Sequence, residues 1–207
     1  MILYKTVAGE AITERIINKS RFVSHVKPVG SKEEGELFIK KIKTEYKDAT
    51  HNVPAIVVGE KQQIQWASDD GEPQGTSGAP MLHYLVEEGL TNLAIVVTRY
   101  FGGIKLGTGG LVRAYTSGAR AVVEAAGIVK AKEMNRIRAE IEYSHLPKVE
   151  YVCRQENIAI ENQNYQEKIT LEFLTEPENT DKIKKLFTDL TSGQLHWLGE
   201  GKEVYFV

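Results

Sequence analysis

The chain has 207 residues, of which 42% are hydrophobic, 26% charged and 8% aromatic. These proportions are those of a globular protein and exclude a disordered, collagen-like or disulfide-stapled chain. The 26 Lys and Arg residues against 28 Asp and Glu residues give a formal charge of −2, which excludes an overall basic coat but allows a local basic patch. A chain of this length forms one or two domains that are large enough to fold without a disulfide bond or a structural metal ion.

Cys153 is the single cysteine, which excludes an intramolecular disulfide and a CxxC metal or redox motif, so a reducing compartment is expected. The first residues lack the apolar stretch of a secretory signal. The longest apolar run, residues 93–97, is far shorter than the roughly 20 residues that span a bilayer. We therefore expect a cytoplasmic protein without a membrane partner.

Recurring apolar residues predict the elements of the first part of the chain. Extended segments are expected at 12–27, as two strands around Asn18-Lys19-Ser20, and at 54–59, 63–67 and 93–101. Helices are expected after a capping-box sequence at Ser31 and Glu34, between Ala79 and Gly89, and from near Leu111 to Gly127. Thr76 or Ser77 is expected to cap the second of these helices. Residues 69–80 hold too much Gly and Pro for a regular element and predict a long loop.

A change of pattern near residue 132 predicts a boundary between a first domain at 1–132 and a second at 133–207. The expected elements of the second domain are a strand at 137–143, a helix at 147–156, a strand at 158–162, a turn at 162–164, a strand at 166–174, a helix at 179–191 and a strand at 194–206. This β-α-β-β-α-β order is that of the ferredoxin-like, or split βαβ, arrangement. The fold class is therefore expected to be α+β.

The strongest local signal is a strand that leads through a glycine-rich segment into a helix. Its glycines are Gly102, Gly103, Gly107, Gly109 and Gly110. Each costs roughly 0.5–1 kcal/mol relative to Ala, so the segment needs backbone shapes or close approaches that side chains forbid. A helix N-terminus favours a phosphate or carboxylate, and the polar residues nearby are Arg99, Lys105, Thr108 and Arg113. The segment is either an anion site or a tight turn packed under another loop.

Common nucleotide-binding templates do not match this segment. Gly102 and Gly107 have the spacing of the first two P-loop glycines, but Thr108 and Gly109 occupy the positions that require Lys and Ser or Thr. A dinucleotide fingerprint that begins at Gly107 requires glycine at position 112, which is valine. An ATP or NAD enzyme of a common type is therefore not expected, and no cofactor is predicted.

The predicted loop at 69–80 contains a second group of candidate residues. Asp69, Asp70 and Glu72 are suited either to Mg²⁺ or acid/base chemistry or to turns and caps. The loop continues with Gly75, Thr76, Ser77 and Gly78. Thr76 and Ser77 are either nucleophiles beside His51 or His83 or helix N-cap residues.

Histidine spacing does not predict a metal site. The five histidines lack HxH and HExxH spacing, so zinc is not predicted. His51 immediately precedes a predicted strand, and we interpret it either as a site residue opposite the glycine-rich segment or as an imidazole with a purely structural role.

Two blocks of sequence resemble a known family. Residues 69–82 read DDGEPQGTSGAPML, and residues 99–115 read RYFGGIKLGTGGLVRAY. They are similar to the two signature blocks of the IMPACT family in its bacterial, YigZ-like form, and the resemblance covers roughly 15–128. The β-α-β-β-α-β tail is similar to the second domain of bacterial members.

The resemblance implies a first domain with the ribosomal protein S5 domain 2-like fold and a second domain similar to the last domain of elongation factor G. That pair of folds occurs in translation factors that meet ribosomal RNA, and eukaryotic relatives regulate translation through the pathway that senses amino-acid starvation. The family offers no catalytic assignment. Family members often have a His-x-Cys-like element where this chain has His51-Asn52-Val53, so the resemblance does not support a thiol mechanism here.

The leading hypothesis is a non-enzymatic, cytoplasmic regulator of translation that associates with RNA or the ribosome. The glycine-rich backbone with Arg99, Lys105 and Arg113 is expected to contact phosphate, and exposed Lys and Arg on the ferredoxin-like sheet are expected to form a second contact surface. One alternative is a hydrolase or phosphate-ligand-binding enzyme that uses residues 69–77 and the glycine-rich segment, with His51 opposite that segment. A second alternative is a protein-binding adaptor. The sequence indicates no oligomeric state.

Overall fold

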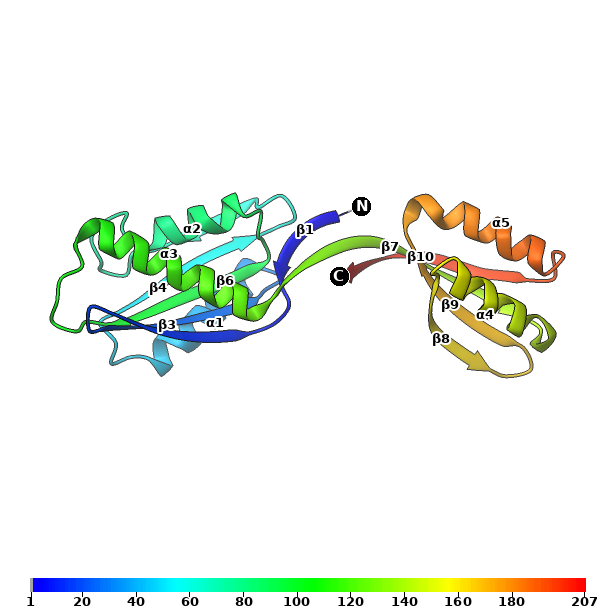
Figure 1. The fold of residues 1–207 in the computed structure, drawn as a ribbon, viewed down its shortest axis with the longest axis horizontal. Helices are drawn as coiled ribbons and strands as arrows, with labels where there is room; N and C mark the ends of the chain where they lie inside the picture. The colour runs from blue at the N-terminus through cyan, green and yellow to red at the C-terminus, as the bar shows by residue number, and fades with distance from the viewer. Residues whose placement is uncertain (1) are drawn as a thin grey trace. The chain divides into compact units, whose positions relative to one another are not determined.

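The computed structural model describes residues 2–207, which divide into two compact domains (Figure 1). The first comprises residues 3–130, and the second comprises residues 131–207 with Ile2. Each domain has a hydrophobic core of its own, and together they form the α+β class that the sequence predicts. Within residues 2–207, no helix is both long enough and apolar enough to cross a membrane.

The first domain is built around an antiparallel sheet with the strand order β2-β3-β6-β4-β5. Its elements are β1 (Ile2–Val7), β2 (Ala11–Ile17), β3 (Ser20–Pro28), α1 (Lys32–Glu45), β4 (His51–Val58), β5 (Ile64–Ala67), α2 (Gly78–Glu87), β6 (Leu93–Tyr100) and α3 (Gly107–Ala126). The predicted extended and helical segments are all present. β1 is an addition that the sequence analysis did not predict.

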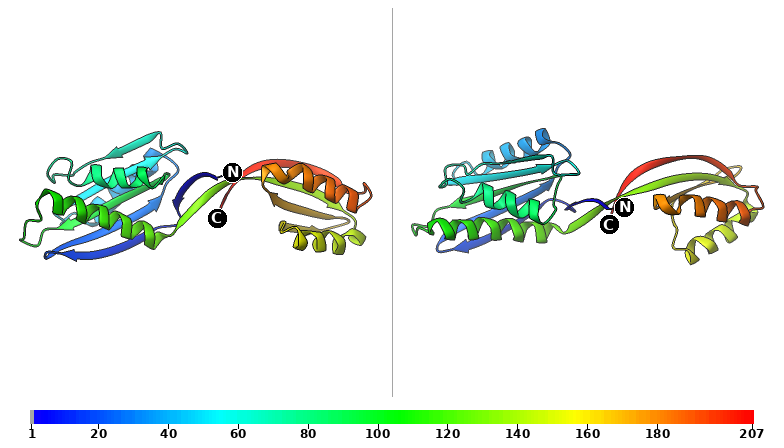
Figure 2. Two further views of the ribbon diagram at one scale, coloured as in Figure 1. Left: turned by 45° about the horizontal axis from the view of Figure 1, so that its top comes forward. Right: turned by 90° about the horizontal axis from the view of Figure 1, so that it is seen from above.

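Helices cover both faces of this sheet (Figure 2). α1 packs Phe38 and Ile42 on one face, against Ile56 and Val96. α2 and α3 cover the other face, where the buried residues include Val53, Ile95, Leu85, Tyr115 and Val122. Because both faces are buried, β4 and β6 are continuous apolar strands rather than alternating ones.

α3 begins four residues earlier than the sequence predicts. The helix starts at Gly107, so Gly109 and Gly110 belong to its first turn, and the loop between β6 and α3 is shorter than the glycine pattern indicated. Glycine is a poor helix former, but α3 is 20 residues long and packs eight of them in the interior. Tertiary packing therefore outweighs the local propensity of the first turn.

The second domain has the ferredoxin-like arrangement. Its elements are β7 (Ile128–Ile141), a 3₁₀ turn (Tyr143–His145), α4 (Leu146–Gln155), β8 (Ala159–Tyr165), β9 (Ile169–Thr175), a second 3₁₀ turn (Pro177–Asn179), α5 (Thr180–Leu190) and β10 (His196–Phe206). The sheet has the order β1-β7-β9-β8, and β10 also pairs with β7. The pairings of β7 with β9 and with β10, and of β8 with β9, are antiparallel. α4 and α5 share one face of it (Figure 2), and Phe173 and Phe187 meet in the core with ring centroids 4.9 Å apart.

Two boundaries in this domain differ from the prediction. β7 is extended from Ile128, not from 137, because residues 131–136 pair with β10, and main-chain pairing needs no apolar alternation. The turn predicted at 162–164 lies instead at 166–168. Asn162 and Asn164 continue the ladder opposite Glu172 and Thr170, so strand pairing outweighs the turn preference of asparagine.

The cations on the helix-free face of this sheet are paired with acids. Arg136 binds Glu172 at 2.9 Å and Glu203 at 2.6 Å, and Arg138 binds Glu172 at 3.1 Å. Lys168 is similarly close to two further glutamates, Glu140 and Glu142. The face therefore presents matched charges rather than the excess of positive charge that phosphate binding needs.

Candidate functional site

The site lies where three strands of the first sheet end at the same level. His51 of β4 and Phe22 of β3 are both paired with Arg99 of β6. Side chains alternate between the two faces of a strand, so Arg99 continues the row of Ile95 and Val97 that faces α2 and α3. The three side chains therefore meet on the face that the start of α3 covers.

Glu72 enters this row from the loop that precedes α2. Its side chain is 3% exposed, and its Oε1 accepts hydrogen bonds from Arg99 Nη1 at 2.8 Å and from the Tyr115 hydroxyl at 2.7 Å. Burial, followed by the hydrogen bond to Glu72, raises the pKa of Tyr115 far above its usual range. The tyrosine therefore keeps its proton and donates it to the carboxylate.

Arg99 is a buried structural cation. Its guanidinium carbon lies 5.6 Å from the centre of the Phe22 ring and 5.4 Å from the centre of the Phe101 ring. Its charge is balanced by Glu72, while its Nε is buried and has no hydrogen-bond partner within residues 2–207. One N–H donor at the floor of the site is thus left unpaired, which is costly in a protein interior.

His51 is held in one orientation by the same loop. Its Nδ1 lies 2.8 Å from the backbone carbonyl of Asp70. A carbonyl only accepts, so Nδ1 carries the proton, and in the neutral ring Nε2 is the free acceptor. Nε2 lies 3.8 Å from Glu72 Oε2, and the side chain is 19% exposed.

The three carboxylates of the loop have separate partners. Asp70 accepts from the backbone N–H of Asn52 at 2.6 Å and pairs with Lys43. Asp69 points to the start of α2, and Glu72 points to Arg99. Residues 2–207 contain no group of three or more His, Cys, Asp or Glu side chains placed to hold a metal ion.

Asp69, and not Thr76 or Ser77, caps α2. Ser77 occupies the N-cap position, but its hydroxyl donates to Asp69 at 2.7 Å, and the Thr76 hydroxyl donates to the Pro73 carbonyl. Asp69 accepts from the backbone N–H groups of Gly75, Ser77 and Gly78 at 2.8, 3.2 and 2.9 Å. The acceptor thus lies eight residues before the N-cap position. Sequence patterns for helix caps consider only the N-cap residue and its immediate neighbours, so they do not predict it.

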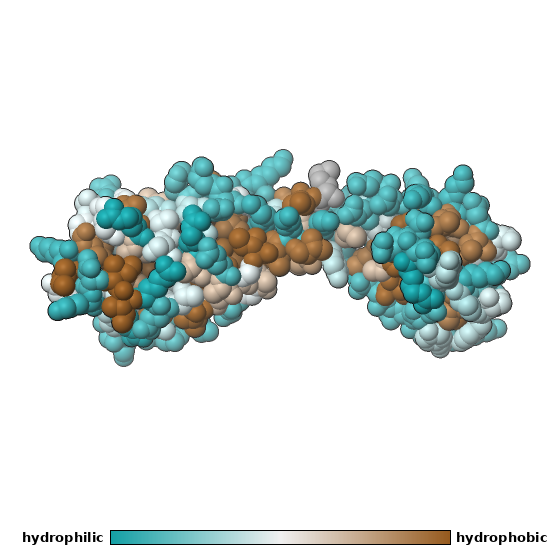
Figure 3. Space-filling model, in the orientation of Figure 1, coloured by the Kyte–Doolittle hydropathy of each residue, from teal (hydrophilic) through white to brown (hydrophobic). Residues whose placement is uncertain are grey.

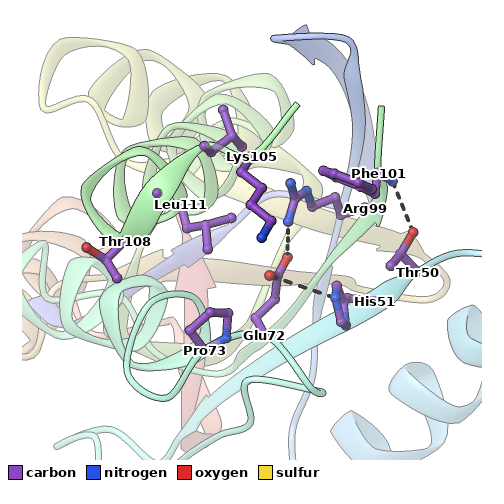
Figure 4. Close-up of a pocket in the computed structure, with 11 residues that line it drawn as sticks. Thr50, His51, Glu72, Pro73, Arg99, Phe101, Lys105, Thr108 and Leu111 are labelled. Carbon is purple, nitrogen blue, oxygen red and sulfur yellow. Dashed lines mark hydrogen bonds and ion pairs between the residues drawn. The ribbon is translucent and has the colours of Figure 1, made fainter. Parts of the chain in front are cut away.

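Residues of both sequence blocks line one cleft of about 440 Å³ (Figure 4). The polar residues in its lining are Thr50, His51, Glu72, Arg99, Lys105 and Thr108, and the others are Pro73, Phe101, Leu106, Gly107 and Leu111. α3 begins at this cleft with no side-chain cap and no acidic residue in its first turn. Its free N–H groups and partial positive charge therefore border the cleft together with Lys105.

Other predicted site residues lie outside the lining of the cleft. Gly102 packs against the turn between β2 and β3, where an added Cβ would lie 2.0 Å from the Lys19 carbonyl oxygen. Gly103 has a φ of +86°, a backbone conformation that favours glycine, in the loop between β6 and α3. Gly109 and Gly110 lie in α3, and Arg113 lines a separate cavity of about 260 Å³. Gly78 meets the Ser68 backbone, where any Cβ would clash.

Several lining residues were not predicted as site residues. Thr50, Pro73, Phe101, Leu106 and Leu111 belong to the cleft, and Tyr115 was assigned only to the packed face of its helix. Phe101 was read as the end of a buried strand, yet it is 46% exposed. The position of an aromatic residue directly before a glycine pair was the one signal that pointed to it.

Comparisons with known proteins agree with the two-domain architecture. The Impact N-terminal domain family matches residues 18–123, and a domain of unknown function, DUF1949, matches residues 140–194. The chain is 40% identical over 202 residues to IMPACT family member YvyE of Bacillus subtilis, covering 98% of this chain and 93% of that protein. It is 33% identical over 185 residues to IMPACT family member YigZ of Escherichia coli, covering 88% of this chain and 90% of that protein. A crystal structure of a hypothetical protein is 31% identical and covers 95% of this chain and 96% of its own, with a TM-score of 0.60.

The buried ion pair makes Glu72 sensitive to neutralisation. Glu72→Gln leaves the Arg99 charge buried without a counter-charge, and we expect it to lower the free energy of unfolding of the first domain by about 3–5 kcal/mol. Urea denaturation followed by Trp66 fluorescence, in a Trp197→Phe background, measures the first domain alone.

Two further variants test whether the unpaired charge is the cause. Glu72→Gln combined with Arg99→Met removes both charges and should recover much of the loss. Glu14→Gln, which breaks the exposed pair with Arg21, should change stability little. A Glu72→Gln protein as stable as Glu14→Gln would show that the buried pair does not stabilise the domain.

Asp69 should make the loop sensitive to acid. Burial acts to raise the pKa of Asp69, but hydrogen bonds from Gly75, Ser77 and Gly78 outweigh it and hold the pKa below its ordinary value. This stabilisation is therefore complete above about pH 4, the ordinary pKa of aspartate, and is lost as the pH falls through the lower folded-state pKa.

The matched variant is Asp69→Asn, whose Nδ2 cannot accept a hydrogen bond where the second carboxylate oxygen does, and we expect it to cost about 1–3 kcal/mol at pH 7. The difference in unfolding free energy between the wild type and this variant should shrink below pH 4, as measured by urea denaturation at a series of pH values. A difference that stays constant down to pH 2.5 would contradict the capping role of the ionised carboxylate.

Proposed function

Because this chain belongs to the IMPACT family, we propose that it is a cytoplasmic regulator of translation that acts by associating with RNA or the ribosome, without catalysis. Family membership rests on the match over residues 18–123 and on the similarity to whole bacterial members. The resemblance to a family whose eukaryotic members regulate translation supports translation as the process in which this chain acts. The first domain carries the contact surface in this proposal.

The cleft is the observation that supports a phosphate-bearing partner. Lys105 has no ion-pair partner among the described residues, and it borders the cleft beside the uncapped start of α3. Phe101, 46% exposed at the same rim, provides a ring on which a base can stack. A cation, a helix N-terminus and an exposed ring together are what single-stranded RNA requires.

The structure changes the roles of two basic residues within this proposal. Arg99 is buried and bound to Glu72, so it supports the floor of the cleft rather than reaching an external strand. Arg113 lies in a separate cavity. Lys105 is therefore the basic side chain that we expect to meet phosphate, and the charge-matched sheet of the second domain contributes little.

We expect purified protein to co-sediment with ribosomes from its own host at low salt and to be released as salt rises. Lys105→Ala should weaken retention and reduce the slope of log affinity against log salt by about one. Lys40→Ala removes an exposed lysine from α1, on the opposite face of the sheet, and should sediment like the wild type. Wild-type protein that stays in the supernatant at low salt would overturn the proposal.

One observation favours a phosphate-ligand hydrolase as a second candidate function. His51 has Nδ1–H fixed by Asp70, and its Nε2 faces the cleft beside Glu72 Oε2. This is the arrangement of a general base that would take a proton from water. If the protein is a hydrolase, His51→Gln should lower turnover by about 10² or more, measured as phosphate release from nucleotides and other phosphate esters. Absence of phosphate release by the wild type would exclude this second function for those esters.

A further inference from the structure

We propose that the cleft binds a phosphomonoester attached to a nucleoside, with the phosphate between Lys105 and the start of α3 and the base against Phe101. The ligand is a free nucleoside monophosphate or the phosphorylated end of an RNA strand. The second source rests on the proposed function, whereas the first does not require it.

The charges around the cleft favour an added anion. Glu72 is the buried carboxylate at the cleft, and it is already matched by Arg99 and by the hydrogen bond from Tyr115. Lys105 and the α3 N-terminus then remain as unmatched positive charge. A phosphomonoester carries up to two negative charges and three free oxygens, whereas an internal phosphodiester carries one charge. The phosphomonoester can therefore interact with Lys105 and with the α3 N-terminus at the same time more strongly than a phosphodiester can.

A second and independent observation lies at the floor. Arg99 is 5% exposed, and its Nε has no hydrogen-bond partner within residues 2–207. A buried guanidinium nitrogen without an acceptor is rare, because an unmade hydrogen bond costs free energy. The side chain lines the cleft, but Nε itself is covered by protein atoms, so a ligand oxygen or a water molecule supplies the missing acceptor only after the side chains beside it shift.

The apolar part of the lining distinguishes a nucleotide from a bare phosphate. Phe101, Leu106, Leu111 and Pro73 border the cleft, which at about 440 Å³ falls within the range of small-molecule sites. The Arg99 guanidinium lies near the Phe101 ring, which remains 46% exposed. Figure 3 shows apolar surface gathered at this end of the first domain, where the loop between β6 and α3 lies. Base stacking is worth about 1–3 kcal/mol in other proteins, so it contributes as much as a charged contact.

The test is a calorimetric titration of the full chain with adenosine 5′-monophosphate, adenosine and inorganic phosphate. We expect the nucleotide to bind at least about tenfold more tightly than either part, because only it reaches both the cation and the ring. A ten-residue RNA with a 5′-phosphate and the same RNA with a 5′-hydroxyl distinguish the two sources. Preference for the phosphorylated RNA supports the strand end, and binding of the free nucleotide alone supports the small molecule.

Two variants assign the contacts. Lys105→Ala should weaken nucleotide binding by about tenfold, and Phe101→Ala should weaken it by about tenfold while leaving the affinity for inorganic phosphate unchanged. Both side chains are partly exposed, so thermal melting should match the wild type. Lys40→Ala, on α1, is the matched control and should bind like the wild type.

The outcomes separate this inference from the proposed function. Equal affinity for adenosine and its monophosphate, or no binding of the nucleotide and of both RNAs, would overturn the inference. Co-sedimentation with ribosomes that persists in that case would leave the proposed function standing. Tight nucleotide binding by a protein that does not co-sediment with ribosomes would support the inference and overturn the proposed function.

Discussion

The ion pair between Glu72 and Arg99 joins three parts of the first domain that are distant in sequence. Glu72 comes from the loop before α2, Arg99 ends the central strand β6, and Tyr115 of α3 donates to the same carboxylate oxygen. Burying two charges is costly, and the cost is offset only when their geometry and remaining hydrogen bonds are satisfied. Loop, sheet and helix must therefore hold their relative positions, and the cleft forms in the space between them.

The two sequence blocks have different roles in forming that cleft. In the first block, the Asp69 carboxylate caps α2 and the Asp70 carboxylate accepts from the Asn52 backbone at the start of β4, so both carboxylates are structural. The backbone carbonyl of Asp70 holds the ring of His51. In the second block, Gly102 lets the chain pass against the β2–β3 turn before α3 begins. The groups of the second block that remain available to a ligand include Lys105, the first N–H groups of α3 and the exposed ring of Phe101.

Local patterns were sufficient for most of the fold but for little of the site. The apolar runs of β4 and β6 and the amphipathic α1 and α3 follow from side-chain periodicity, so the sequence predicted them. The start of β7 and the turn after β8 were misplaced because strand pairing decided them. Arg99 was expected to meet phosphate, and its burial against Glu72 depends on a contact across 27 positions.

The sequence by itself determined the class of the fold, the order of its elements after β1 and the family, because these depend on periodicity and on short motifs whose residues are adjacent in the chain. Tertiary structure alone decided which charges are free. Asp69, Asp70, Glu72, Arg99 and Lys105 read as one set of polar residues in the chain, yet four of them are bound to protein partners and Lys105 is left at the cleft. A charge is available to a ligand only if no nearer partner neutralises it, and such partners are brought close by folding rather than by position in the sequence.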